Sequence, residues 1–211
     1  YKNVFFLGGN GSFNFYHWMI EILPKLLLIN NSHIDKYDID TIVVNDRVKE
    51  NHNYMWLLES CLSHLDKVNI VYVNQRDNIF VKNIFFMNTF NQTVYNFRDY
   101  NYKYSVSTIY NMESLKYLEK KLNIKIVDDK SNFYKKVFIL RDEETVSKFN
   151  KRSYNQREVF DFFQKKGFVG ISFGKLTLTE QARIFKNADF IVGPSGASWS
   201  NLIFAKSGAK A

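Results

Sequence analysis

The chain has 211 residues, of which 45% are hydrophobic and 17% aromatic; this excludes a disordered protein and gives enough length for one large or two small domains. No apolar run reaches the about 18 residues of a membrane-spanning helix, and a single cysteine, Cys61, excludes an internal disulfide. The formal net charge is +8, and +7 of it belongs to residues 131–211, with 14 Lys and Arg against 7 Asp and Glu. This region is expected to attract phosphate, nucleic acid or an anionic membrane, unless its lysines only solvate the surface.

The first part of the chain, residues 1–130, predicts an α/β domain with an irregular alternation of elements. Strands are expected at VFFLGG, DTIVVND, VNIVYV and IFVKNIFFM, which are rich in β-branched and aromatic residues. Helical periodicity is expected over residues 15–30, 53–64 and 107–122, the first of these containing Pro24. The chain opens directly in a predicted strand, so we expect it to be a piece of a longer protein.

The last part, residues 131–211, alternates more regularly. KKVFIL, FVGISF and DFIVGP predict strands, and NQREVFDFFQKKG, TLTEQARIFKNA and SGASWSNLIFAK predict helices, with Thr177 or Thr179 placed to cap the second helix. Strands that alternate with helices of this length predict parallel βαβ units, and therefore a Rossmann-like domain. Because it ends after a helix, before the strand expected next, we expect this domain to be incomplete.

Two such domains would face each other across a cleft. In open parallel sheets, ligands bind beyond the carboxyl ends of the strands. The candidate sites are therefore the segments that follow strands: residues 8–17, 141–152 and 193–201.

The turn VGPSGASWSN follows a predicted strand and opens a predicted helix. Small residues allow close approach to the backbone, and a helix start offers free N–H groups and a positive dipole end, a combination that favours phosphate. An ordinary tight turn would use the same residues for geometry alone. The candidate binding residues are Gly193, Pro194, Ser195, Gly196, Ala197, Ser198 and Asn201.

Arg141 directly follows the strand KKVFIL, so its side chain is expected to project toward a ligand at the carboxyl edge. A guanidinium can pair with two phosphate oxygens at once. The alternative is a surface salt bridge with the acidic residues at 142–144; we favour the functional interpretation. Arg152, further along the loop, fits the surface role better.

The stretch NFYHWMIEILPKL places His17 and Glu21 one helical turn apart, among aromatic and apolar residues. Three interpretations fit. The pair could be half of a metal site, although no third ligand is suggested nearby. It could be a hydrogen-bonded structural pair in a kinked helix. It could also do acid–base work, since a carboxylate in a dry site has a raised pKa and can accept a proton from a hydroxyl.

Two blocks of the chain resemble glycosyltransferase family 61, whose bacterial members include capsular polysaccharide enzymes. The first block is NFYHWMIEILPKL, with Asn, two aromatics, His, an acidic residue four positions later, and then Leu-Pro and a basic residue. The second block is LTEQARIFKNADFIVGPSGASWSNLIFA, with Val-Gly-Pro, Gly-Ala and Asn-Leu-x-Phe, and Arg141 matches the arginine expected between the blocks. One departure is Ser195, where many members carry His.

The resemblance implies a GT-B architecture and an inverting sugar transfer from a nucleotide-sugar donor to a saccharide acceptor, with no metal and no cofactor. For such a transfer, our hypothesis is that Glu21 is the base, with His17 as its orienting partner or as the base itself. Arg141 and the 193–201 turn would hold the donor diphosphate. Asn14, Tyr16 and Trp18 would lie on the acceptor side. The expected location is the cytoplasm or the inner face of the cell membrane, where the basic region could contact anionic lipid.

Two other classes of function fit parts of the sequence. A catalytically inactive polysaccharide-binding scaffold would keep the fold and lose donor binding. A nucleic-acid-binding protein would use the basic residues 131–211, but it predicts basic residues interleaved with stacking aromatics on one surface. Many aromatics here fall in predicted strands and helices, so no nucleic-acid partner is expected.

Overall fold

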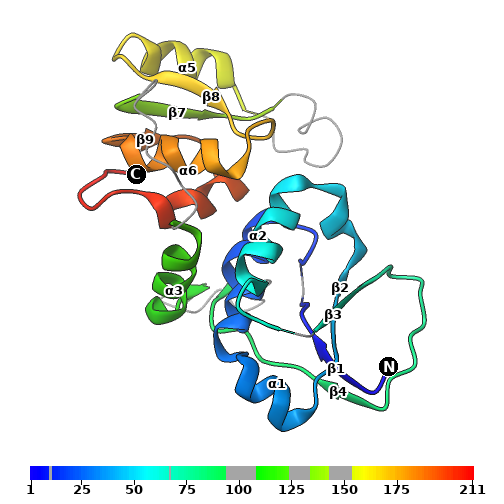
Figure 1. The fold of residues 1–211 in the computed structure, drawn as a ribbon. Coiled ribbons are helices and arrows are strands. Elements are labelled where there is room, and N and C mark those ends of the chain that lie inside the picture. Colours follow the sequence, from blue (N-terminus) through cyan, green and yellow to red (C-terminus); the bar gives the residue numbers. More distant parts are fainter. Residues whose placement is uncertain (10, 67, 94–107, 124–133, 143–153) are drawn as a thin grey trace, which may run out of the picture. The chain divides into compact units, whose positions relative to one another are not determined.

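The computed structural model describes residues 1–9, 11–66, 68–93, 108–123, 134–142 and 154–211. They form two compact units, Tyr1–Leu122 (unit 1) and Asn123–Ala211 (unit 2). The predicted boundary between residues 130 and 131 lies outside the described residues, as does Arg152. Both units combine a parallel sheet with helices, so the protein is α/β and compatible with a Rossmann-like fold (Figure 1).

Unit 1 is built on a four-stranded sheet in the order β3-β2-β1-β4, with every neighbouring pair parallel. Two short strands pair antiparallel apart from it. The elements are β1 (Asn3–Phe6), α1 (Asn31–Tyr37), β2 (Thr41–Asn45), the 3₁₀ helix η3 (Asp46–Glu50), α2 (His52–Leu62), β3 (Asn69–Val73), β4 (Asn83–Phe85), β5 (Gln92–Thr93), β6 (Thr108–Ile109) and α3 (Met112–Asn123).

Most of these elements follow the sequence pattern, but η3 and β5 were not predicted, and three further elements differ from the prediction. The strand predicted at IFVKNIFFM shortens to the three residues of β4, which pair only with β1 at the sheet edge. Residues 108–109, predicted helical, pair with β5 instead, so α3 begins at Met112. The pattern did not predict α1, whose N-cap Asn30 accepts a hydrogen bond from the backbone N–H of His33.

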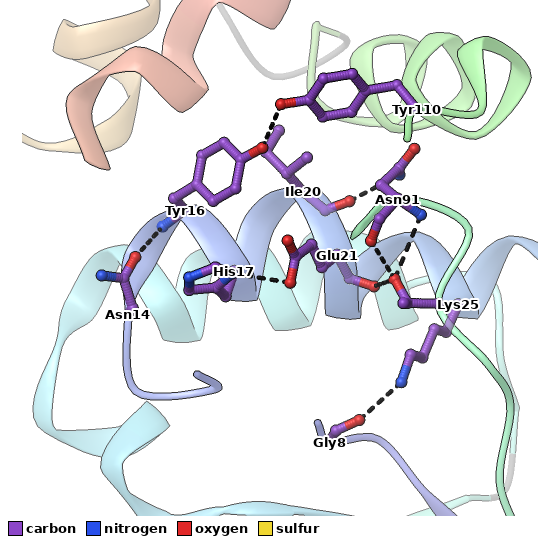
Figure 2. Close-up of polar contacts among 10 residues, drawn as sticks. Gly8, Asn14, Tyr16, His17, Ile20, Glu21, Lys25, Asn91 and Tyr110 are labelled. Carbon is purple, nitrogen blue, oxygen red and sulfur yellow. Dashed lines mark hydrogen bonds and ion pairs between the residues drawn. The ribbon is translucent and has the colours of Figure 1, made fainter. Parts of the chain in front are cut away.

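The predicted helix over residues 15–30 is present, but Pro24 changes its hydrogen bonding. A π-helix, η1 (His17–Ile22), gives way to a 3₁₀ helix, η2 (Leu23–Leu28). Pro24 has no N–H, so the Ile20 carbonyl lacks its α-helical donor. Asn91 Nδ2 donates to that carbonyl at 2.8 Å (Figure 2). Thr89 Oγ1 donates to the carbonyl of Glu21 at 2.9 Å. Side chains from the segment after β4 thus stabilise the irregular helix.

Asn91 is fully buried and connects the irregular helix to the start of α3. Its Nδ2 also donates to Ser114 Oγ at 2.9 Å, and its Oδ1 accepts from the Asn111 N–H at 2.7 Å. Buried polar atoms left without partners are costly, so these bonds fix the position of the Asn91 side chain.

The apolar side of the irregular helix packs beside α2 (Figure 1). Trp18 stacks on Tyr54 of α2, with ring centroids 6.1 Å apart, and Phe15 meets the same ring edge-on at 5.6 Å. Trp18, Met19, Ile22 and Leu26 are almost completely buried. Burial of these apolar side chains fixes the position of the helix against α2, and the polar residues of the helix lie on a different face.

Unit 2 contains the three-stranded parallel sheet β8-β7-β9 predicted from the sequence. The Thr177 hydroxyl caps the second helix in a capping box with Glu180. The last helix, predicted without a type, is a 3₁₀ helix. The elements are β7 (Lys136–Leu140), α5 (Gln156–Gln164), β8 (Val169–Ser172), α6 (Leu178–Asn187), β9 (Phe190–Val192) and η4 (Ala197–Phe204). Within the described part of the chain, no helix is long and apolar enough to cross a membrane.

The role of Asn91 can be tested with Asn91→Leu. The change leaves the Ile20 carbonyl and the Asn111 N–H without their partners, and each unsatisfied buried group costs about 1–3 kcal/mol. We expect the free energy of unfolding of unit 1 to fall by at least about 2 kcal/mol. The measurement is urea unfolding followed by tryptophan fluorescence. Gln92→Ala, at the exposed neighbouring position, should leave stability within about 0.5 kcal/mol; equal losses in the two variants would contradict this role.

Candidate functional site

The central feature of unit 1 is a hydrogen bond of 2.8 Å between His17 Nδ1 and Glu21 Oε2 (Figure 2). Both residues are buried, with 9% and 6% of their surface exposed. Both residues belong to the π-helix η1, and π-helical segments often occur at functional sites. A buried carboxylate that engages an imidazole is a chemical unit able to accept, hold and pass on a proton.

One of the glycines that follow β1, Gly11, packs against the ring of His17. Gly11 has a backbone φ of +76°, and a Cβ placed there would lie 2.7 Å from Cδ2 of His17. Only glycine satisfies both the left-handed backbone and the close approach to the imidazole ring. The sequence analysis identified residues 8–17 as a candidate site because they follow a strand, and the Gly11–His17 contact gives that segment a physical connection to the pair.

Lys25 extends the series, because His17, Glu21 and Lys25 recur every four residues. It is 6% exposed, and its Nζ donates to the Gly8 carbonyl at 2.8 Å (Figure 2). Burial lowers the pKa of the Lys25 ammonium, and the negative charge of Glu21 partly opposes that change. Lys25 therefore ties the glycines after β1 to the helix and places a positive charge near the carboxylate.

The three acceptor-side candidates take different positions. Asn14 is exposed, and its Oδ1 accepts from the Tyr16 N–H at 3.0 Å at the start of the helix. The Tyr16 hydroxyl hydrogen-bonds to the hydroxyl of Tyr110 (Figure 2). Trp18 is fully buried against Tyr54, so its side chain supports the helix from the core. Of the three side chains, Asn14 is exposed, Tyr16 is half-buried and Trp18 belongs to the core.

In unit 2, Arg141 meets the candidate turn directly, since its Nη2 donates to the Ser195 carbonyl at 2.6 Å. The backbone of Arg141 is held on both sides by Gln156 of α5, whose Oε1 accepts from the Arg141 N–H at 2.7 Å and whose Nε2 donates to its carbonyl at 3.1 Å. The guanidinium also lies 6.0 Å from the ring centroid of Tyr154. Two segments that the sequence singled out separately thus form one cluster.

The residues of the turn itself divide into buried and exposed groups. A Cβ at Gly193 would lie 2.6 Å from Cβ of Ile139, so glycine there allows β9 to pack on β7. Asn201 is fully buried, and its Nδ2 donates to Gln181 Oε1 at 2.8 Å, which ties η4 to α6. Ser195 and Gly196 are exposed, and a Cβ at Gly196 would meet nothing within 4 Å. No packing contact explains the glycine at 196.

The remaining candidates in the turn support its shape or line its opening. The Pro194 carbonyl accepts from Trp199 Nε1 at 2.8 Å, the Ala197 carbonyl from Ser200 Oγ at 2.8 Å, and the Ser198 carbonyl from Asn201 Nδ2 at 3.1 Å. The described residues contain no group of three or more His, Cys, Asp or Glu side chains arranged to hold a metal ion.

The family model of glycosyltransferase 61 matches residues 15–211. The chain belongs to glycosyltransferase family 61. The match begins one residue after Asn14 and includes His17, Glu21, Arg141 and the 193–201 turn. The protein is therefore a glycosyltransferase by family, as the sequence motifs indicated. No curated protein and no solved structure is significantly similar to the chain.

The sequence analysis missed three residues that organise the sites of this family 61 member. Lys25 was visible as the basic residue of the first block, and its spacing from Glu21 was the available signal. Asn91 and Gln156 act through contacts 71 and 15 residues away along the chain. Nothing in local periodicity indicates such partners.

The buried charge of Lys25 predicts a pH dependence of stability. Because its pKa in the folded state lies below the ordinary value of 10.5, the unfolded chain binds more protons between these two pKa values. The unfavourable contribution of Lys25 is present below the folded pKa and disappears as the pH rises toward 10.5. We therefore expect wild-type stability relative to Lys25→Met to increase across this window, measured by urea unfolding at several pH values. If the free energies of unfolding of the wild type and Lys25→Met changed with pH in parallel, the lowered pKa of a buried Lys25 ammonium would be contradicted.

Gly193 and Gly196 form a matched pair for testing the turn. Gly193→Ala forces a methyl group against Ile139, and overpacking of this kind costs about 1–3 kcal/mol. Gly196→Ala enters open space from an extended backbone with φ of 174°, so its stability should change by less than about 1 kcal/mol. Thermal unfolding of both variants measures the difference; a destabilisation by Gly196→Ala as large as that by Gly193→Ala would refute the assignment.

Proposed function

We propose that this family 61 glycosyltransferase is an inverting enzyme that transfers a sugar from a nucleotide-sugar to a saccharide acceptor, in the synthesis of a capsular or other surface polysaccharide. The observation that carries the proposal is the buried His17–Glu21 pair, bonded at 2.8 Å on the helix that follows β1. A scaffold that only bound polysaccharide would have no need to bury an ionisable pair at the cost of desolvating it.

The reaction is a single in-line displacement at the anomeric carbon. The acceptor oxygen forms the new glycosidic bond while the bond to the diphosphate oxygen breaks, and the configuration inverts. The proton of the attacking hydroxyl goes to Glu21, while the His17 ring orients the carboxylate through the 2.8 Å bond. In the alternative assignment His17 takes the proton and Glu21 orients the ring, as carboxylates do in other acid–base pairs.

The leaving diphosphate gains negative charge as the bond breaks, and we assign its stabilisation to unit 2. Arg141 is held by Gln156 and bonded to the Ser195 carbonyl, so its guanidinium is fixed beside the exposed Ser195 and Gly196. The start of η4 adds backbone N–H groups, and the charge of +7 over residues 131–211 adds a favourable field. Fixed donors and charges of this kind can replace a metal ion.

We further propose the GT-B arrangement, in which unit 1 carries the base and the acceptor and unit 2 carries the donor. A parallel sheet in each unit supports this assignment. The enzyme would act in the cytoplasm or at the inner face of the membrane. We expect no nucleic-acid partner.

The base assignment is tested by turnover of Glu21→Gln with nucleotide-sugars, followed as release of the nucleoside diphosphate. Loss of the base should lower turnover by roughly 10²–10⁴-fold and leave nucleotide affinity unchanged, because Glu21 acts on the acceptor proton. Glu59→Gln, an exposed change of the same type on α2, is the matched control and should retain full turnover.

A decrease below tenfold for Glu21→Gln would contradict its role. His17→Gln separates the two assignments. If Glu21 takes the proton, His17→Gln lowers turnover less than Glu21→Gln does. If His17 takes the proton, His17→Gln lowers turnover more.

A further inference from the structure

A second polar feature of unit 1 lies where β2 and β3 end. Asn45, the last residue of β2, pairs with Val73, the last residue of β3, so the residues that follow both strands emerge at the same place. They line a hollow of about 240 Å³. Its lining residues are Asp46, Arg47, Asn74, Gln75 and Arg76. The helix with His17 and Glu21 follows β1, the neighbour of β2, so this hollow belongs to the same carboxyl edge at which parallel sheets bind ligands (Figure 1).

The acidic and amide groups around the hollow hydrogen-bond to one another. Asp46 Oδ2 accepts from Asn74 Nδ2 at 2.8 Å, and the Asn74 N–H donates to Asp77 Oδ2 at 2.8 Å. These bonds fix the turn after β3 against the start of η3. They also occupy the Asp46 and Asp77 carboxylates with neutral donors.

The guanidinium groups of Arg47 and Arg76 differ from these groups, because no carboxylate pairs with them among the residues that the structure describes. Arg47 and Arg76 are exposed, and neither takes part in any ion pair between residues that the structure describes. Both line the same hollow, whose lining contains the carboxylate of Asp46, while the carboxylate of Asp77 next to Arg76 is bonded to the Asn74 N–H. Like charges brought together in this way favour an anionic ligand, and guanidinium groups pair well with planar or tetrahedral oxyanions.

The hollow adjoins the segment that leads into the candidate site. The guanidinium of Arg47 lies 5.7 Å from the ring centroid of Phe13, a cation–π contact. Phe13 is 57% exposed, and its carbonyl accepts from the Tyr54 hydroxyl at 3.1 Å. The next residue, Asn14, begins the helix that carries His17. A ligand in the hollow would therefore reach toward the acceptor side of unit 1 along the exposed ring of Phe13.

We propose that Arg47 and Arg76 bind an anionic substituent of the saccharide acceptor, a phosphate or a carboxylate. The assignment to the acceptor rests on the proposed function, which places the base in unit 1; the anion binding itself does not. Asn74 and Gln75 add amide groups that suit sugar hydroxyls, and the Phe13 ring offers an apolar face to a sugar ring.

The test is a titration of the ¹⁵N-labelled chain, followed by the amide chemical shifts of Arg47, Asn74 and Arg76. The probes are glucose 1-phosphate, glucuronic acid, glucose and a nucleoside diphosphate, so the phosphate and carboxylate sources are separated from the neutral sugar and from the donor nucleotide. We expect saturable shifts with one or both anionic sugars and none with glucose. The affinity should fall with added salt, because charged groups carry the contact.

Arg47→Gln combined with Arg76→Gln should weaken the anionic probe at least about tenfold, since charge-assisted bonds are lost. Both positions are exposed, and an unchanged melting temperature verifies the fold of the variant. Arg157→Gln, an exposed arginine of unit 2, and Arg141→Ala should leave these shifts unchanged. Equal binding by the double variant, or equal binding of glucose, would overturn the inference.

Two further outcomes separate this inference from the proposed function. Anion binding at Arg47 and Arg76 in a chain that transfers no sugar would uphold the site and reject the function. Shifts caused only by a nucleoside diphosphate would overturn the acceptor assignment, because they would place the donor at this hollow.

Discussion

A carboxylate can be buried only if neighbouring groups compensate its charge, and this requirement governs the structure around Glu21. His17 lies one turn before it and bonds to it at 2.8 Å, while the ammonium of Lys25 lies one turn after it and is itself buried. Pro24 lies directly before Lys25. Because proline has no N–H, it removes the donor that an α-helix would have supplied to the Ile20 carbonyl. Asn91 satisfies that carbonyl from 71 residues away. The π-helix, the pair and the buried asparagine therefore depend on one another.

The same dependence explains how much of unit 1 could be predicted. The strands β1, β2 and β3 follow from their β-branched and aromatic runs, and Pro24 was visible as a disturbance of the first helix. The change from π to 3₁₀ hydrogen bonding was not predictable, because it depends on side chains of Thr89 and Asn91 that reach the helix only in the folded protein. Spacing alone placed His17 beside Glu21. It did not show that the ring of His17 would be covered by Gly11.

In unit 2 the secondary structure was predictable, but the roles of the residues in the 193–201 turn were not. Its regular alternation predicted the parallel sheet and the position of Arg141 after β7, and it left the cap of α6 open between Thr177 and Thr179, of which the structure uses Thr177. The pattern could not distinguish glycines that serve packing from a glycine that faces open space, because that distinction depends on the distance from Gly193 to Ile139 on another strand. Likewise Asn201, a candidate for ligand binding, is directed to Gln181 in the interior. The exposed part of the turn, Ser195 and Gly196, is the part that we propose to contact the donor.

We propose that unit 2 of this family 61 glycosyltransferase binds a nucleotide-sugar through Arg141 and the adjoining turn without a metal. The most direct measurement is the melting temperature of the chain against a panel of nucleoside diphosphates and nucleotide-sugars, with and without a chelator. The account predicts an increase with one nucleotide that survives chelation, is lost in Arg141→Ala and persists in Arg157→Ala. An increase that requires a divalent cation, or that Arg141→Ala retains, would contradict it.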